Sequence, residues 1–317
     1  MNSHSKEFSM NKLKIRPGYA CINLADKNNF RKFRLKTIED NDISKIREVI
    51  EHNIRLLSET ISYNIKNQIY VYRIPSDLIP FATNIKMKQI LSDNEILNTN
   101  QIRDELKKIR EWQTKYQLRL SIHANHFLIL ASPNEQVKNQ SIEELQELIK
   151  VLEWINGDGI VIHVGGAYGD KVETLKRFKE VIQAYKDSID FSKIMVENDD
   201  KIYNGLDVSL LCRELGLRWV FDFHHERCNP SPEIDLVNLL KAYLPSKYHL
   251  SSGIEGAFKP PHADYIFKED LEALMELLIK VDIKEADIMF EAKKKNLSIY
   301  EILKPVANGY WELKDTN

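Results

Sequence analysis

Short runs of β-branched and other apolar residues recur along the chain and alternate with longer amphipathic segments. One run, Ile160 to Ile162, follows a glycine and is typical of a strand buried in a parallel sheet. Seven more runs have this character, and together they predict strands at 16–24, 68–74, 118–122, 160–162, 193–196, 217–221, 247–250 and 286–290. These strand signals lie a few tens of residues apart, which is the spacing of βαβ units.

Between these runs, apolar residues recur with the 3.6-residue period of amphipathic helices. The clearest example begins after Asp42, the expected N-cap, and continues to Ile61. Ser141 and Glu144 have the spacing of a capping box and predict that another helix begins there. Further helices are expected at 101–116, 142–155, 171–184, 208–215, 235–243 and 268–281.

The alternation of eight strands with helices indicates parallel βα units, and eight such units favour a single closed (β/α)8 TIM barrel. A doubly wound open sheet is the alternative, but it gathers its site at one crevice and does not explain polar residues at the ends of nearly every strand. No internal linker or repeat divides the chain. We expect a polar tail at 1–12, the barrel at 13–303 and a C-terminal tail at 304–317.

Composition narrows the functional classes. The chain has 317 residues, of which 43% are hydrophobic, and no run approaches the ~20 apolar residues of a membrane span. The first residues carry no apolar signal core, and the three cysteines lack metal or disulfide spacing, so we expect a cytoplasmic protein. The formal net charge is -2, so any contact with nucleic acid must use a local basic patch or bound cations.

Histidines and carboxylates stand at or just beyond the carboxyl ends of the predicted strands. They are His123, His163, Glu197, Asp222, His225, His249 and Glu291. In a barrel these ends converge on one mouth, and imidazole with carboxylate is a ligand set for zinc, manganese or iron. The set exceeds one tetrahedral site and predicts two to three divalent ions, an arrangement suited to phosphoryl transfer. Any one of these residues alone would more often be a hydrogen-bonded core residue.

Lys247 lies two residues before His249, so both side chains are expected to face the barrel interior. An ammonium beside metal cations would be repelled unless it is neutral or modified. The alternative is that the strand begins later and Lys247 points to solvent.

A basic loop follows the first predicted strand and contains Arg31, Lys32, Arg34 and Lys36. Such a run either contacts phosphates or is a solvated charged surface, and the residues do not decide between the two.

Several motifs together resemble the UV damage endonucleases, metal-dependent relatives of endonuclease IV in the xylose-isomerase-like barrel group. The resemblance runs from about residue 18 to residue 293. The motifs are G-Y-A-C-I-N-L, R-I-P-S-D-L-I-P-F-A, L-S-I-H, I-V-I-H-V-G-G-A-Y-G, V-E-N-D, D-x-x-H at 222–225, K-Y-H-L-S-S, H-A-D-Y and F-E-A-K.

The resemblance implies roles for individual residues. It assigns metal binding to the seven strand-end residues and adds His262, from H-A-D-Y. It matches Lys247 to a lysine that the family carries in carboxylated, anionic form, which would remove the repulsion described above. Tyr19 and Asn23 match residues near the lesion and the scissile phosphate. We therefore expect Lys247, Glu197 and Asn23 to be catalytic, and Arg73 to join Tyr19 and the basic loop in binding DNA.

The resemblance also implies a substrate and a cofactor. The expected substrate is duplex DNA with ultraviolet photoproducts, cut immediately 5′ to the lesion to leave a 3′-hydroxyl and a 5′-phosphate, with manganese as the metal. The chain departs from the family at His126 and Phe127, where a Gln-Tyr pair commonly wedges into the duplex. Both rings can still stack on a base, although their hydrogen bonds would differ. The alternative for Phe127 is packing against neighbouring loops.

Three other activities are alternatives to this one. A sugar isomerase or epimerase on the same barrel would also use divalent metal, but it needs neither the basic loop nor so many ligands. A degenerate barrel that only binds nucleic acid would not need the complete ligand set. An abasic-site endonuclease is the nearest alternative and remains open as a side activity. We expect a monomer with no organic cofactor and no membrane association.

Overall fold

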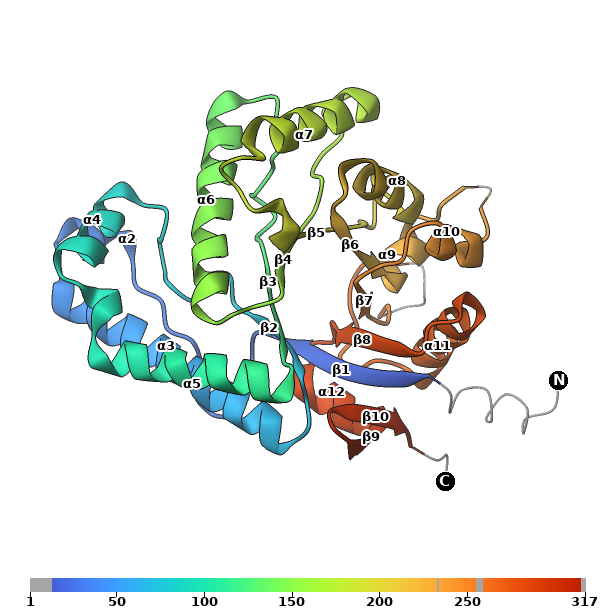
Figure 1. The fold of residues 1–317 in the computed structure, drawn as a ribbon, viewed down its shortest axis with the longest axis horizontal. Helices are drawn as coiled ribbons and strands as arrows, with labels where there is room; N and C mark the ends of the chain where they lie inside the picture. Colours follow the sequence, from blue (N-terminus) through green and yellow to red (C-terminus); the bar gives the residue numbers. More distant parts are fainter. Residues whose placement is uncertain (1–12, 233, 255–258, 315–317) are drawn as a thin grey trace.

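Eight parallel strands close into a barrel in the computed structural model, which describes residues 13–232, 234–254 and 259–314 (Figure 1). Strands β2 to β8 follow one another in order around the barrel, and β1 pairs in parallel with both β8 and β2. The predicted (β/α)8 barrel is therefore confirmed. The predicted tail at 1–12 lies outside the described residues.

The barrel strands are short and the helices between them vary in length. The strands are β1 (Lys14–Ala20), β2 (Val71–Ile74), β3 (Arg119–His123), β4 (Gly159–Ile162), β5 (Ile194–Glu197), β6 (Arg218–Asp222), β7 (Lys247–Leu250) and β8 (Glu285–Phe290). The α-helices are α2 (Leu35–Glu39), α3 (Ile43–Lys66), α4 (Ile85–Asp93), α5 (Asn100–Tyr116), α6 (Glu135–Trp154), α7 (Lys171–Tyr185), α8 (Gly205–Leu215), α9 (Phe223–Cys228), α10 (Leu236–Ala242), α11 (Lys268–Val281) and α12 (Lys295–Ile302). Short 3-10 turns occupy Ile96–Asn98 and Phe191–Lys193.

Most of the core lies between the strands and the surrounding helices. Residues in a strand alternate between two faces, so those between the outward core positions point into the barrel. Val161, Met195 and Val220 meet there in a small apolar layer of their own. Two residues further along the same strands, the interior positions become polar, and this step from apolar to polar creates the candidate site at the carboxyl ends.

The first strand ends earlier than predicted. It stops at Ala20 rather than at residue 24, because Cys21 adopts a left-handed backbone conformation with φ 64° and the chain turns away from the sheet. Asn23 therefore lies in the loop that follows β1.

The capping box predicted at Ser141 and Glu144 is wrong. Helix α6 begins two turns earlier, where the Asn134 side chain accepts hydrogen bonds from the backbone N–H groups of Gln136 and Val137. Ser141 lies inside the helix and its hydroxyl donates to the Val137 carbonyl at 2.7 Å. An Asn that caps outcompetes an internal Ser with the correct downstream spacing.

The predicted C-terminal tail is also corrected. Residues Leu303–Ala307 (β9) and Tyr310–Leu313 (β10) form a hairpin, and β10 pairs antiparallel with β1 (Figure 1). Trp311 is 2% exposed and its indole N–H donates to the Gln68 carbonyl at 2.8 Å. This hairpin therefore extends the folded domain beyond residue 303, up to the last described residues.

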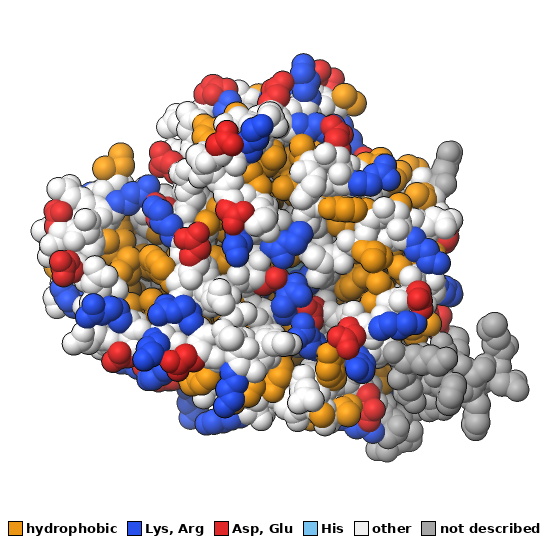
Figure 2. Space-filling view, viewed as in Figure 1, with side chains coloured by type: hydrophobic (Ala, Val, Ile, Leu, Met, Phe, Trp, Pro, Cys, Tyr) orange, Lys and Arg blue, Asp and Glu red, His pale blue; other side chains and the backbone are white. Residues whose placement is uncertain are grey.

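Charge is mixed over the face seen in Figure 2. Lysine and arginine side chains are interspersed with aspartate and glutamate there, without one continuous basic area. No helix among the described residues is long and apolar enough to cross a membrane.

Candidate metal centre and the loops at the barrel mouth

Glu197, the last residue of β5, lies at the centre of the strand-end cluster and is 1% exposed. One carboxylate oxygen lies 2.8 Å from His123 Nε2 and 3.5 Å from His163 Nε2. The other oxygen lies 2.7 Å from His249 Nδ1 and 3.9 Å from His225 Nδ1. A single carboxylate thus faces imidazoles from β3, β7 and the ends of β4 and β6.

Three groups of ligand atoms that could each hold a metal ion share this carboxylate. They are His123, His163 and Glu197; Glu197, His249 and Glu291; and Glu197, Asp222 and His225. Within each group the ligand atoms lie within 4.8 Å of one another. All seven residues chosen from strand ends alone are therefore brought into one cluster. A shared carboxylate in adjoining groups is the arrangement that bridges ions in multi-metal sites.

Asn198 fixes the Asp222 end of the cluster. Its side chain is fully buried, donates to the Asp222 carbonyl at 3.0 Å and accepts from the Asp222 N–H at 2.8 Å. Asp222 in turn caps the short helix α9 by accepting from the His225 N–H at 2.7 Å. The last residues of β5 and β6 are thereby held together, which orients both candidate ligands.

Four histidines of the site face backbone carbonyls with Nδ1. The pairs are His123 with Ala124 at 2.8 Å, His163 with Glu197 at 3.3 Å, His225 with Asn198 at 3.0 Å and His262 with Glu291 at 2.8 Å. A carbonyl only accepts, so Nδ1 carries a proton in each ring, and in the neutral ring Nε2 keeps its lone pair. This is the tautomer that metal-binding histidines usually have.

His262 lies beside the cluster without joining any of the three groups. Besides its bond to the Glu291 carbonyl, its ring lies 6.3 Å from the His225 ring. The Glu291 carboxylate lies 3.2 Å from His249 Nδ1 and forms an ion pair with Arg73. Burial alone would raise the pKa of Glu291, but Arg73 and His249 hold it well below its usual range. Arg73, predicted to bind DNA, therefore also neutralises a candidate ligand.

The groups around Glu197 keep its carboxylate ionised. Burial would raise the pKa of Glu197, but His249 and the hydrogen bond with His123 hold it well below its usual range. Burial would lower the pKa of His225, but Asp222 and Glu197 raise it to about 9. A buried carboxylate thus stays ionised because cationic or proton-donating groups surround it.

Two buried atoms of the cluster have no hydrogen-bond partner in the structure, His249 Nε2 and Asp222 Oδ2. Buried polar atoms are nearly always satisfied, and a site that binds an ion is one reason for an exception. Together with the Nε2 atoms that face Glu197, these two atoms show that the residues present fit divalent metal ions.

Lys247 is fully buried, as expected for an interior position of β7, but its ammonium does not face the cluster. Its Nζ donates to Ser121 Oγ at 2.8 Å and lies 4.0 Å from Asp158. Burial lowers the pKa of Lys247 to about 8. The expectation that this ammonium lies beside the metals is therefore corrected, because the side chain extends toward the amino ends of the strands.

A layer of charged residues surrounds Lys247 at those amino ends. Ion pairs within it join Arg16 to Asp287 at 2.6 Å, Arg119 to Asp158 and Asp287 at 2.9 Å, and Arg218 to Asp158 at 3.1 Å. Four cations thus face two carboxylates, and the layer carries an excess of positive charge.

Tyr19 does not face the site, which corrects its predicted place beside the lesion. Alternation along β1 directs Ala20 into the barrel and Tyr19 outward, where its hydroxyl donates to Asn64 of α3 at 2.7 Å. Tyr19 is 0% exposed and packs against Tyr72. Asn23 is also buried, and its side-chain oxygen accepts from the Ala25 N–H at 3.1 Å in the turn after β1.

The basic loop is exposed, and two of its cations pair with acidic neighbours. Arg31 lies 3.0 Å from Glu48, and Lys32 forms an ion pair with Asp77. Arg34 and Lys36 are exposed. Exposed pairs of this kind contribute little to stability, so these cations remain accessible to a phosphate.

His126 and Phe127 project from the loop after β3. Phe127 is 70% exposed, and the two rings lie 4.0 Å apart. Asn125 holds the loop by accepting from the Phe127 N–H at 2.8 Å. Packing of Phe127 against neighbouring loops is thus not what the structure shows.

Sequence reasoning missed the supporting residues of the site. Asn198 carries a signal, since it directly follows Glu197 at a strand end, but an Asn there also fits an ordinary turn. Asn125 carries none, because its role depends on contacts between loops that are far apart in sequence.

Comparisons with known proteins agree with this geometry. A family model described as UV-endonuclease UvdE matches residues 15–316. The UV DNA damage endonuclease of Bacillus velezensis is 30% identical over 270 residues, which cover 82% of this chain and 82% of that protein. The crystal structure of SacUVDE superimposes with a TM-score of 0.75 and 25% identity, covering 90% of this chain and 95% of that one.

The barrel is also shared more widely. Endonuclease IV from Thermus thermophilus matches with a TM-score of 0.56 over 87% of this chain and 92% of that one, at 13% identity, which shows a common fold. The family match and the Bacillus relative each cover most of the chain. The chain therefore belongs to the UV-endonuclease UvdE family, whose named members are UV DNA damage endonucleases.

Proposed function

We propose that this protein hydrolyses one phosphodiester bond of duplex DNA immediately 5′ to an ultraviolet photoproduct, leaving a 3′-hydroxyl and a 5′-phosphate. Two to three divalent ions, with manganese as the favoured metal, would be held by the cluster around Glu197. The observation that carries the proposal is the Glu197 carboxylate shared by three groups of candidate ligands.

Each part of the cluster has a distinct task in this proposal. Bound divalent ions would supply Lewis acidity at the phosphate and lower the pKa of the attacking water. Glu197 would be a ligand common to the three groups, and His123, His163 and His225 would offer Nε2 while their Nδ1–H groups donate to backbone carbonyls. Asn198 would keep Asp222 and His225 in place. The mixture of imidazole and carboxylate suits manganese, zinc or iron, and the family resemblance favours manganese.

Carboxylation of Lys247 is supported by charge balance in the layer at the amino ends. As an ammonium, Lys247 leaves four cations facing two carboxylates. As a carbamate it would leave three arginines facing three anions, and buried charges are tolerated best when they are paired. Lys247 would then support the barrel beneath the metals as a positioning residue and would not touch the phosphate.

The loops at the mouth would bind the duplex. The exposed Phe127 and His126 would stack in a gap opened at the lesion, because damaged steps unstack at lower cost. The basic loop would contact phosphates without reading sequence. Asn23, buried at the mouth, would position its loop near the scissile phosphate. The monomeric state and the cytoplasmic location stay predictions.

Incision of defined duplexes tests this function. The purified protein would be incubated with manganese and end-labelled duplexes that carry one cyclobutane dimer, one six-four photoproduct, one abasic site or no damage. We expect a cut immediately 5′ to each photoproduct, none in the undamaged duplex and none after chelation of metal. Stronger cutting at the abasic site than at either photoproduct would instead identify an abasic-site endonuclease.

A further inference from the structure

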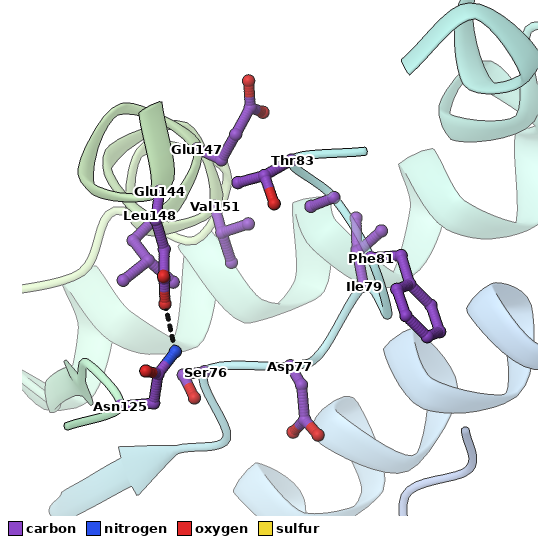
Figure 3. Close-up of a pocket in the computed structure, with 11 residues that line it drawn as sticks. Ser76, Asp77, Ile79, Phe81, Thr83, Asn125, Glu144, Glu147, Leu148 and Val151 are labelled. Atoms are coloured by element: carbon purple, nitrogen blue, oxygen red, sulfur yellow. Dashed lines mark hydrogen bonds between the residues drawn. The ribbon is translucent and has the colours of Figure 1, made fainter. Parts of the chain in front are cut away.

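A small pocket lies between the loop that follows β2 and helix α6, close to the exposed Phe127 (Figure 3). Its volume is about 190 Å³. Pockets that hold drug-sized ligands are roughly 300–1,000 Å³, so this one suits about one ring system. It lies outside the candidate metal centre, and none of the residues that line it belongs to that cluster.

Asn125 joins this pocket to the loop that carries Phe127. Its side-chain oxygen accepts from the Phe127 N–H at 2.8 Å, and its side-chain nitrogen donates to Glu144 of α6. Figure 3 shows Asn125 and Glu144 pointing toward each other at one side of the pocket. A ligand in the pocket would therefore contact the same Asn125 side chain that holds the loop with the exposed phenyl ring.

The basic loop reaches the opposite rim of the pocket. Lys32 forms an ion pair with Asp77, which lines the pocket. Phe33 stacks on Phe81 of the lining, with ring centroids 5.9 Å apart and an interplanar angle of 27°. Phe81 is held with a positive φ of 57°, so its backbone is strained in a way that only supporting contacts maintain. The pocket thus lies where two loops proposed to bind DNA meet.

The lining selects for a flat, hydrogen-donating ring and against a phosphate. Leu148, Val151 and Ile79 provide an apolar wall, and Phe81 is available for stacking. Its charged side chains are the carboxylates of Asp77, Glu144 and Glu147. Asp77 pairs with Lys32, and Glu147 pairs with Lys88 and Lys150, which leaves Glu144 as the acceptor for an amino group. Among the described residues, Glu144 has one hydrogen-bond partner, Asn125, and burial raises its pKa despite that bond. The second oxygen of this half-buried carboxyl group is open to a donor in the pocket.

We propose that this pocket receives an unpaired purine base from the strand opposite the photoproduct, with the exocyclic amino group directed to Glu144. The inference rests on the proposed function. A photoproduct joins pyrimidines, so the bases that lose their partners are purines, and both adenine and guanine carry an amino group on their pairing edge. Thymine has no exocyclic amino group and offers a carboxylate only its N3–H.

Incision kinetics with paired changes in protein and DNA test this inference. The manganese-loaded protein would be given duplexes with one thymine dimer, opposite which one adenine is kept, replaced by unsubstituted purine, or replaced by a nucleotide without a base. Thr83→Trp fills the pocket from its rim. Ile85→Trp adds the same ring nearby on a side chain that is 83% exposed and outside the lining.

We expect kcat/KM on the adenine duplex to fall about tenfold in Thr83→Trp, which is the scale of one lost stacking contact, and to stay unchanged in Ile85→Trp. On the duplex without the opposite base, kcat/KM of the wild type should fall to the value of Thr83→Trp on the adenine duplex. The kcat/KM of Thr83→Trp should be the same on both duplexes. Equal losses on base removal in the wild type and in Thr83→Trp would overturn the inference.

Glu144→Leu provides a second variant of similar size that leaves the rim intact. The wild type should cut the adenine duplex several-fold faster than the purine duplex, and Glu144→Leu should cut both at the slower rate. A preference for adenine that survives in Glu144→Leu would show that the amino group is read elsewhere. If the wild type cuts none of the dimer duplexes, the proposed function itself fails, whereas cutting that ignores the opposite base overturns only this inference.

Discussion

The direction in which each strand-end side chain points, into or out of the barrel, decides whether it can belong to the site. The seven strand-end histidines and carboxylates converge as predicted. His163, Glu197 and Asp222 each lie two residues after an apolar interior position, so alternation along the strand turns them inward. Tyr19 was misplaced for the same reason. The resemblance assigned it to the lesion, but Ala20 takes the inward position on β1 and Tyr19 packs against α3.

Asn198 offers a test of positioning at residue scale. Asn198→Ala should lower the affinity for manganese about 10- to 100-fold, the usual effect of losing a group that orients metal ligands. Both hydrogen bonds to the Asp222 backbone would be lost, while every candidate ligand stays. Titration calorimetry with manganese measures the effect. Asn229→Ala, which removes a single bond to the Asp199 carbonyl, is the matched control. Equal affinities in both variants would contradict the role of Asn198.

Lys247 offers a second test. The intact protein, measured by mass spectrometry under mild conditions, should exceed the sequence mass by one carbon dioxide, and acid should remove the adduct. Lys247→Arg should slow incision and lower the melting temperature, because guanidinium stays cationic in a layer that already has excess positive charge. If the intact mass equals the sequence mass under every mild condition, the lysine is unmodified. If Lys247→Arg also cuts DNA at the wild-type rate, the lysine is dispensable.

At the scale of elements, the loops after the strands carry the proposed contacts with DNA. Phe127→Ala should reduce the preference for damaged over undamaged duplex about tenfold, since stacking on an exposed base is worth ~1–3 kcal/mol. Metal content and melting temperature should stay nearly constant, because the phenyl ring is 70% exposed. Gel-shift titrations with both duplexes measure the preference. If Phe127→Ala instead loses ~3–5 kcal/mol of stability, as is typical of core phenylalanines, and keeps the preference for damaged duplex, Phe127 has a structural role.

The basic loop should act differently from Phe127. Replacing Arg31, Lys32 and Arg34 together by glutamine should weaken binding to damaged and undamaged duplex equally and make the salt dependence shallower. Replacing Lys107, Lys115 and Lys186, which lie on or beside helices outside this loop, is a charge-matched control. If the salt dependence of DNA binding in the loop variant equals that of the wild type, the loop is a solvated charged surface that does not contact phosphates.

Element boundaries were less predictable than element types. Helix α6 was predicted, but its start was not, because Asn134 and Ser141 both precede plausible helical segments and only tertiary contacts choose between them. Ser141 is used inside the helix, where its hydroxyl also accepts from the Ile129 N–H at 2.8 Å. That bond ties α6 to the loop before it and has no local sequence signal.

At the scale of the whole molecule, the barrel could be predicted because its strands are continuous apolar runs separated by periodic helices. The hairpin of β9 and β10 was missed although Asn308 and Gly309, both with positive φ, carry the signal of a tight hairpin turn. Its docking on the barrel has no local signal, because the contacts of Trp311 reach back to Ile15 and Gln68. The charge layer beneath the site was missed for a similar reason. Its members lie on six different strands or their starts, and only closure of the barrel brings them together.

The central claim is that Glu197 organises a centre of several ions in this barrel. Metal content measured by elemental analysis after loading with manganese tests it most directly, in the wild type, in Glu197→Gln and in the exposed control Glu173→Gln. Glutamine keeps the size of the side chain but removes the charge that three ligand groups share. We predict two to three ions in the wild type and the control, and at most one in Glu197→Gln with the fold retained. An equal metal content in all three proteins would contradict the account.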